Sequence, residues 1–174
     1  MCGEETPSST PRVGARVDFY PASGLQHTHL PVGNLVFLNP SSPSSCHATH
    51  VRFSQRPSTS TTATATTTTT TTHTHEDGDE SVLVSIHMTG DLTKPLADSG
   101  LLRRFTFRPN SSSSSSSSRK DDDGVEMPLP GEALSLNVGN DGIIGRRVSM
   151  MRGNEVLADG IVGFNFLPVV AADA

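Results

Sequence analysis

The 174-residue sequence has few aromatic side chains and no long apolar run. Tryptophan is absent, aromatic residues make up 5% of the chain, and nothing resembles the aromatic stacking pattern of an RNA-binding sheet. No apolar stretch approaches the roughly 20 residues that a membrane-spanning helix requires. We therefore expect neither a nucleic-acid partner of that type nor a membrane partner.

Cysteine and positive charge are also scarce. Cys2 and Cys46 are the two cysteines, which do not make the dense disulfide framework of a small secreted domain, so we expect a reducing compartment. The formal net charge is -5, and adjacent arginines occur as isolated pairs at 103–104 and 146–147. Because binding of a phosphate backbone requires a basic face, the charge also argues against nucleic acid.

The first residues lack the features of a targeting segment. No charged region is followed by an apolar one, and Glu4 and Glu5 do not suit a transit peptide, which is rich in arginine and poor in acidic residues. We expect a soluble chain whose compartment the sequence leaves undetermined.

Two low-complexity tracts divide the chain. Residues 58–72 are almost entirely Thr, Ser and Ala, and residues 111–118 are all Ser. Such tracts bury too little apolar surface to offset the entropy of ordering them, so we expect both to be mobile. The resulting organisation is a flexible tail (1–11), a short β-rich segment (12–57), a Thr-rich insertion with a His-x-Asp loop (58–77), and a domain (78–170) interrupted by a mobile segment (111–124).

Alternation of apolar and polar residues, or a short run of apolar and branched residues, predicts strands in both folded parts. The expected strands cover residues 12–20, 35–38, 51–53, 82–86, 104–108, 134–138, 143–151 and 155–166. Tight turns are expected at 139–142 and 153–154, because both contain Gly and Asn. The last three strands are therefore expected to pair consecutively as one antiparallel sheet.

One helix is expected between these strands. Leu92, Leu96, Leu101 and Leu102 follow Gly90-Asp91 at approximately helical spacing. Asp91 suits the N-cap, and Pro95 is tolerated near the first turn. Gly100 weakens the helix, so we expect it to be short or to end there. The pattern predicts an α+β domain in which a curved antiparallel sheet wraps around one central helix.

This order of elements resembles the hotdog fold of the MaoC-like hydratases and dehydratases, and within it the mitochondrial 3-hydroxyacyl-thioester dehydratases. The matching phrases are Arg52-Phe53-Ser54, His75-Glu76-Asp77, Val82 to His87, Gly90-Asp91-Leu92-Thr93, Arg104 to Arg108, Pro128 to Glu132 and Asp159 to Val162. The resemblance implies a hotdog-like sheet around a central helix, with the Thr-rich and Ser-rich tracts as disordered insertions. It also implies a lyase of fatty acid metabolism.

The resemblance further implies the substrate, the assembly and the site. The substrate is a 3-hydroxyacyl or 2-enoyl thioester of CoA or of an acyl-carrier protein, no cofactor or metal is needed, and the chain forms a homodimer or pairs with another hotdog domain. His75 is the catalytic acid or base, Asp77 orients it, and the backbone amides of Gly90, Asp91 and Leu92 bind the substrate carbonyl. The family is mitochondrial, but no transit peptide is evident in the sequence, so we keep the cytoplasm as an alternative expectation.

Two departures from the family pattern weaken the expected activity. The family places Asp or Asn about five residues before the catalytic histidine, and this chain has Thr70 there. The phrase from His87 to Leu92 also carries two extra residues. We therefore expect weak hydration activity or none.

The residues alone leave other interpretations open. His73 and His75 also suit the polar end of a solvated tract, and His-x-His pairs suit zinc, although no Cys-x-x-Cys or His-Glu-x-x-His frame accompanies them. The alternative function is a non-catalytic, β-rich interaction module that docks a partner through an exposed strand edge.

Overall fold

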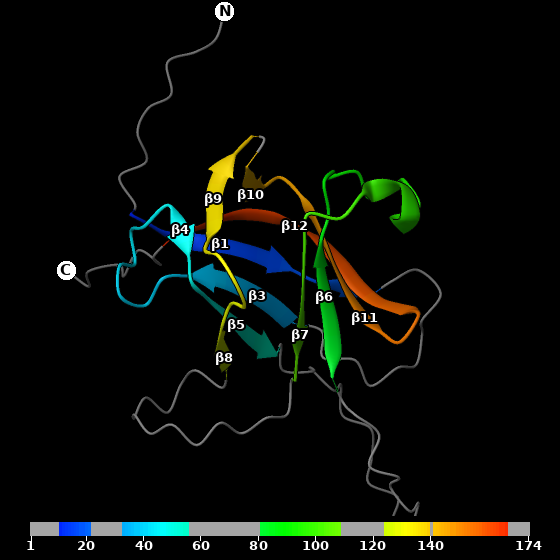
Figure 1. The fold of residues 1–174 in the computed structure, drawn as a ribbon, viewed down its shortest axis with the longest axis horizontal. Helices are drawn as coiled ribbons and strands as arrows, with labels where there is room; N and C mark the ends of the chain where they lie inside the picture. Colours follow the sequence, from blue (N-terminus) through cyan, green and yellow to red (C-terminus); the bar gives the residue numbers. More distant parts are fainter. Residues whose placement is uncertain (1–10, 22–32, 56–80, 109–123, 140, 167–174) are drawn as a thin grey trace, which may run out of the picture.

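The computed structural model describes residues 11–21, 33–55, 81–108, 124–139 and 141–166, and these residues are nearly all strand (Figure 1). The elements in chain order are β1 (Arg12–Asp18), β2 (Tyr20–Pro21), β3 (Gly33–Leu38), β4 (His47–Ala48), β5 (His50–Gln55), β6 (Val82–Ile86), the 3-10 turn η1 (Leu96–Ser99), β7 (Arg103–Phe107), β8 (Gly124–Pro128), β9 (Leu134–Val138), β10 (Gly142–Ile144), β11 (Arg147–Arg152) and β12 (Glu155–Phe166).

One curled antiparallel sheet forms most of the molecule (Figure 1). Its strands lie in the order β7-β6-β11-β12-β1-β3-β5-β8, and β2 adds to β12. β12 lies between β11 and β1, so the sheet joins strands from residues 12–55 to strands from residues 82–166. No described helix is long and apolar enough to span a membrane.

The core lies on the concave face of this sheet. Alternate residues of each strand point inward, such as Val82, Val84 and Ile86 on β6, and all three are buried. The rings of Phe53 on β5 and Phe107 on β7 meet with their centroids 5.1 Å apart, although many strands separate β5 from β7 along the sheet. The sheet therefore curls far enough for side chains near its two edges to touch.

A small second sheet extends the core. β9 pairs antiparallel with β4 and parallel with β10, which gives the order β10-β9-β4 (Figure 1). Leu134, Leu136 and Ile143 from this sheet are buried within the main core cluster. The expected single antiparallel sheet of the last three strands is therefore wrong, because β9 pairs in parallel with β10 in the second sheet. The expected antiparallel pairing at the C-terminal end is confirmed by β11 and β12.

The expected central helix is absent from the described residues, so the hotdog fold is wrong. The segment after Asp91 contains only the four-residue 3-10 turn η1, and its Leu92 and Leu101 side chains are 44% and 49% exposed. Pro95 precedes the turn, and Gly100 ends it with a φ of 61°. The leucine spacing reflects a solvent-facing loop, and strand side chains fill the core that a helix would have filled.

Candidate functional site

The two expected catalytic residues, His75 and Asp77, lie outside the described residues, as do Thr70 and the whole of both low-complexity tracts. The structure therefore gives no geometry for the expected acid or base. The segments that we expect to be mobile and the expected N-terminal tail also lie outside the described residues, apart from Pro11 and Gly124.

Gly90, Asp91 and Leu92 lie in the loop between β6 and η1, and they do not begin a helix. The Asp91 carboxylate accepts hydrogen bonds from the Thr93 hydroxyl at 2.6 Å and from the Thr93 amide at 2.9 Å, which lower the pKa of Asp91. A Cβ at Gly90 would lie 1.9 Å from the carbonyl oxygen of Gly145. Gly90 thus permits a close backbone approach, and helix-dipole polarisation of a bound carbonyl has no structural basis here.

The loop from Met88 to Leu102, which we call the cover loop, lies against the convex face of the sheet. The amides of Met88 and Thr89 both donate to the Ser99 carbonyl, which closes the loop on itself. The Arg147 side chain on β11 donates to the Lys94 carbonyl at 2.9 Å. The loop thereby buries polar side chains that point away from the hydrophobic core.

His87 and Ser149 form the centre of this buried polar layer. His87 is 4% exposed and Ser149 is fully buried. Nδ1 of His87 lies 2.8 Å from the Gly100 carbonyl oxygen, and Nε2 lies 2.8 Å from Oγ of Ser149. Because a carbonyl oxygen can only accept, Nδ1 carries the proton, and Nε2 accepts from the Ser149 hydroxyl.

The electrostatic surroundings keep the His87 ring neutral. Burial lowers its pKa from the ordinary value of 6.5, and the charges of Arg147 and Arg104 lower it further, whereas the Gly100 carbonyl and Asp159 raise it. Arg147 itself is paired with Asp159 at 2.6 Å, with the two side chains 8% and 21% exposed. A neutral ring suits the two hydrogen bonds that His87 makes.

A serine hydrogen-bonded to a histidine is also the arrangement of a nucleophile and its base. Here Ser149 is fully buried, and its partner is fixed by a backbone carbonyl, which cannot stabilise a protonated ring as a carboxylate does. The pair therefore fastens the cover loop to β11, and its geometry does not support attack on a substrate.

A pocket of about 280 Å³ opens between the cover loop and the sheet. Its lining combines a few polar groups with apolar ones: Ser85, His87, Leu96, Ala97, Gly100, Leu101, Arg104 and Met151. Ser85 faces Arg104 on β7 and Ser149 on β11 in the strand register, so the polar side chains form one row across three strands.

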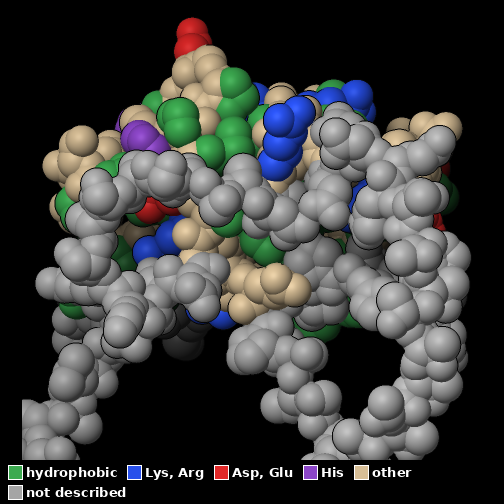
Figure 2. Space-filling view, turned by 90° about the horizontal axis from the view of Figure 1, so that it is seen from below, with side chains coloured by type: hydrophobic (Ala, Val, Ile, Leu, Met, Phe, Trp, Pro, Cys, Tyr) green, Lys and Arg blue, Asp and Glu red, His purple; other side chains and the backbone are tan. Residues whose placement is uncertain are grey.

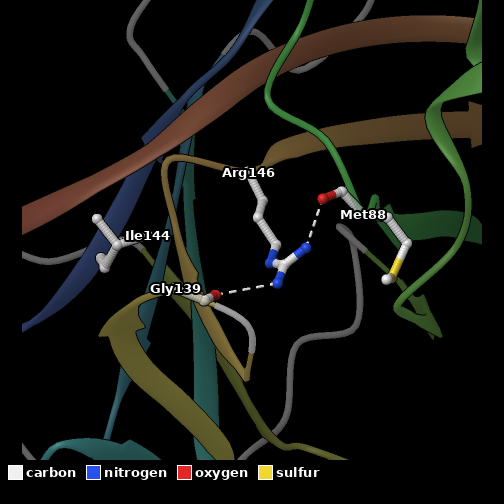
Figure 3. A pocket seen from close by; sticks show the side chains of 4 residues that line it. All are labelled: Met88, Gly139, Ile144 and Arg146. Carbon is white, nitrogen blue, oxygen red and sulfur yellow. Dashed lines mark hydrogen bonds between the residues drawn. The ribbon is translucent and has the colours of Figure 1, made fainter.

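A second pocket, of about 460 Å³, lies beside Arg146 (Figure 3). It is lined by Met88, Gly139, Ile144 and Arg146. The guanidinium points between two loops and donates to the carbonyls of Met88 and Gly139, and Nε donates to Gly142 (Figure 3). Arg146 joins the β9–β10 turn to the end of β6, and its hydrogen bonds to backbone indicate a structural role.

The edges of the main sheet are formed by β7 and β8, each of which has one strand neighbour within the described part of the chain. β7 pairs with β6 from Arg103 to Phe107, and β8 pairs with β5 from Gly124 to Pro128. Figure 2 shows basic side chains at separate positions among hydrophobic and polar ones on the visible part of the lower face. Both edge strands present backbone N–H and C=O groups on which another strand can pair.

Sequence reasoning did not identify His87, Ser149 or Ser85 as a group. The signal present in the sequence is a polar residue at an alternate position of a strongly apolar strand, as at Ser85 in 82–86 and Ser149 in 147–152. Comparison with protein-family models, with curated proteins and with solved structures finds no match for this chain.

Proposed function

We propose that this chain is a non-catalytic interaction module that binds an extended peptide segment along the free edge of β7. The observation that carries the proposal is the position of β7 at the end of the main sheet, where β6 is its one strand neighbour among the described residues. An edge strand offers backbone N–H and C=O groups that an added strand can pair with.

The other edge is a poorer template. β8 begins at Gly124 and ends at Pro128, and proline has no N–H to donate. β7 contains neither glycine nor proline. Two of its five side chains, Phe105 and Phe107, are anchored in the core, so the strand is already held extended before a partner arrives.

The side chains of β7 define the chemistry of the partner. Arg104 and Thr106 are exposed on the convex face, whereas Phe105 and Phe107 lie on the concave face. A strand added to β7 places alternate residues beside each set, because directly opposed residues share a face. We therefore expect a segment in which acidic residues alternate with apolar ones.

The described residues offer no comparable support for catalysis. The buried Ser149 and His87 hold the cover loop, and the expected carbonyl-binding amides do not begin a helix. Thioester hydration through His75 and Asp77, the thioester partner and the paired assembly stay predictions from the sequence.

A fluorescein-labelled peptide of alternating Glu and Val tests the proposal by fluorescence anisotropy. Strand addition uses the amides on one side of the peptide. Methylation of every second backbone nitrogen should therefore abolish binding when the methyl groups lie on the paired side, and it should preserve binding when they lie on the other side. Thr106→Lys should strengthen binding and Thr106→Glu weaken it, each by up to about fivefold, because one cross-strand charge pair contributes up to about 1 kcal/mol.

Asn154 provides the matched control. It is exposed in the turn between β11 and β12, away from the sheet edge, so Asn154→Lys and Asn154→Glu repeat the charge changes at a distant position. Equal effects of the Thr106 and Asn154 substitutions, or equal binding by both methylated peptides, would refute pairing along β7.

A further inference from the structure

The pocket beneath the cover loop contains a buried polar group without a partner. Ser85 is 1% exposed, and its hydroxyl forms no hydrogen bond with any described residue. A buried hydroxyl without a partner costs about 1–3 kcal/mol, so it marks a place where the structure accommodates something else. Ser85 lines the pocket, but its hydroxyl oxygen is itself buried, so a molecule that enters must shift the pocket wall slightly to reach it.

A positive charge lies beside the same hydroxyl. Arg104 lines the pocket and faces Ser85 in the register of β6 and β7. Its side chain is exposed and makes no hydrogen bond or ion pair with a described residue. Both ring nitrogens of His87 are already hydrogen-bonded, to Gly100 and Ser149. The ring therefore lines the pocket but has no hydrogen bond left to offer a ligand.

The remaining walls of the pocket are mostly apolar. Leu96 and Leu101 come from the cover loop, and Met151 comes from β11. The volume of about 280 Å³ exceeds the roughly 150 Å³ of a cavity that accommodates benzene. The pocket thus combines one cation, one hydroxyl and a short apolar surface, which is the usual composition of a small-molecule site.

We propose that this pocket binds a small organic carboxylate with a short apolar tail. The carboxylate pairs with Arg104 and accepts the hydrogen bond of Ser85, and the tail lies against Leu96, Leu101 and Met151. Occupancy satisfies the hydroxyl of Ser85 and holds the cover loop against the sheet. Peptide pairing uses the backbone of β7, so the pocket is a second site, and the two sites share only the charge of Arg104.

Hexanoate is the test ligand, followed by chemical shifts in a ¹H–¹⁵N spectrum of the full chain. We expect saturable shifts centred on Ser85, Ala97 and Leu101, with an affinity in the millimolar range or tighter. Hexanamide has the same tail without the charge and should bind about tenfold or more weakly, because charged hydrogen bonds contribute more than neutral ones.

The Ser85→Ala variant distinguishes an effect on ligand binding from an effect on the stability of the fold. Removing an unsatisfied hydroxyl should leave thermal stability unchanged or higher, yet it should weaken hexanoate binding about tenfold. Ala97→Phe should block the pocket. Arg104→Gln should abolish the preference for hexanoate over hexanamide, whereas Arg152→Gln at the exposed end of β11 should preserve it.

A pocket that holds water alone would give no saturable shift at these residues, and this result would overturn the proposal. Shifts centred on another surface, or unchanged binding by both Ser85→Ala and Ala97→Phe, would also overturn it. If Ala97→Phe proves unstable, the comparison of wild type with Ser85→Ala decides the question.

Discussion

The neutral state of His87 predicts a loss of stability on mild acidification. The pKa of His87 in the folded protein lies below 6.5, chiefly because the ring is buried, and the unfolded chain keeps the ordinary value. The folded state therefore binds fewer protons than the unfolded state as the pH falls below 6.5. Its contribution to stability is complete above that pH and is lost as the pH falls toward the pKa of the folded state.

The size of the effect follows from this one proton. Between the two pKa values the free energy of unfolding should fall by up to about 1.4 kcal/mol for each pH unit. Protonation would also place a donor at Nε2 against the hydroxyl of Ser149, which must then turn its own proton away. The acid-induced change should therefore loosen the cover loop before the rest of the sheet.

Urea unfolding followed by circular dichroism, from about pH 7.5 to about pH 5.5, measures this dependence. His87→Gln keeps a neutral side chain in place and should have a smaller slope of stability against pH than wild type. His47→Gln removes an exposed histidine and should retain the wild-type slope. An unchanged slope in His87→Gln, or stability that rises on acidification in wild type, would show that His87 is not buried in neutral form.

Two further substitutions test the packing around the cover loop. Gly90→Ala brings a Cβ within 1.9 Å of the Gly145 carbonyl and should cost about 2 kcal/mol or more in thermal unfolding, whereas Gly163→Ala, with its nearest atom at 3.9 Å, should be tolerated. Arg147→Met leaves the partly buried Asp159 without its partner and should cost about 3 kcal/mol in urea unfolding, and adding Asp159→Asn should recover part of this loss. A double variant as unstable as the sum of the two single variants would remove the argument for direct pairing.

Local alternation of residues was sufficient to predict most of the long strands. The segment 134–138 shows it clearly, whereas 82–86 was predicted from a short run of branched apolar residues, and both are strands in the structure. β8 was missed because Gly124 and Pro128 at its ends resemble a linker beside the Ser run. It becomes a strand through pairing with β5, and such distant pairing leaves no local pattern in the sequence.

The helix prediction was wrong because leucine spacing alone cannot report which side of a segment faces the core. Leu92 and Leu101 matched a helical period, yet Pro95 and Gly100 interrupt the segment and both leucines stay exposed. Once the helix is lost, the family resemblance loses the element that defined its fold.

The polar layer could not be predicted, because its contacts join distant residues. His87 and Ser149 are 62 positions apart, and they meet because β6 and β11 are neighbours in the sheet. The sequence shows each as a single polar residue near apolar ones. The pairing depends on strand order and register, which the alternation pattern leaves undetermined.

The central position of β12 has a consequence for the order of folding. Arg12 on β1 faces Phe166 on β12, so the two halves of the main sheet join through residues far apart in the chain. Contacts of such high sequence separation slow folding, because the entropy of closing the chain is lost before the contacts form. During synthesis, β1, β3 and β5 emerge long before β12. One edge of β1 therefore stays unpaired until β12 has been synthesised. This nascent edge is where we expect a chaperone to be needed most.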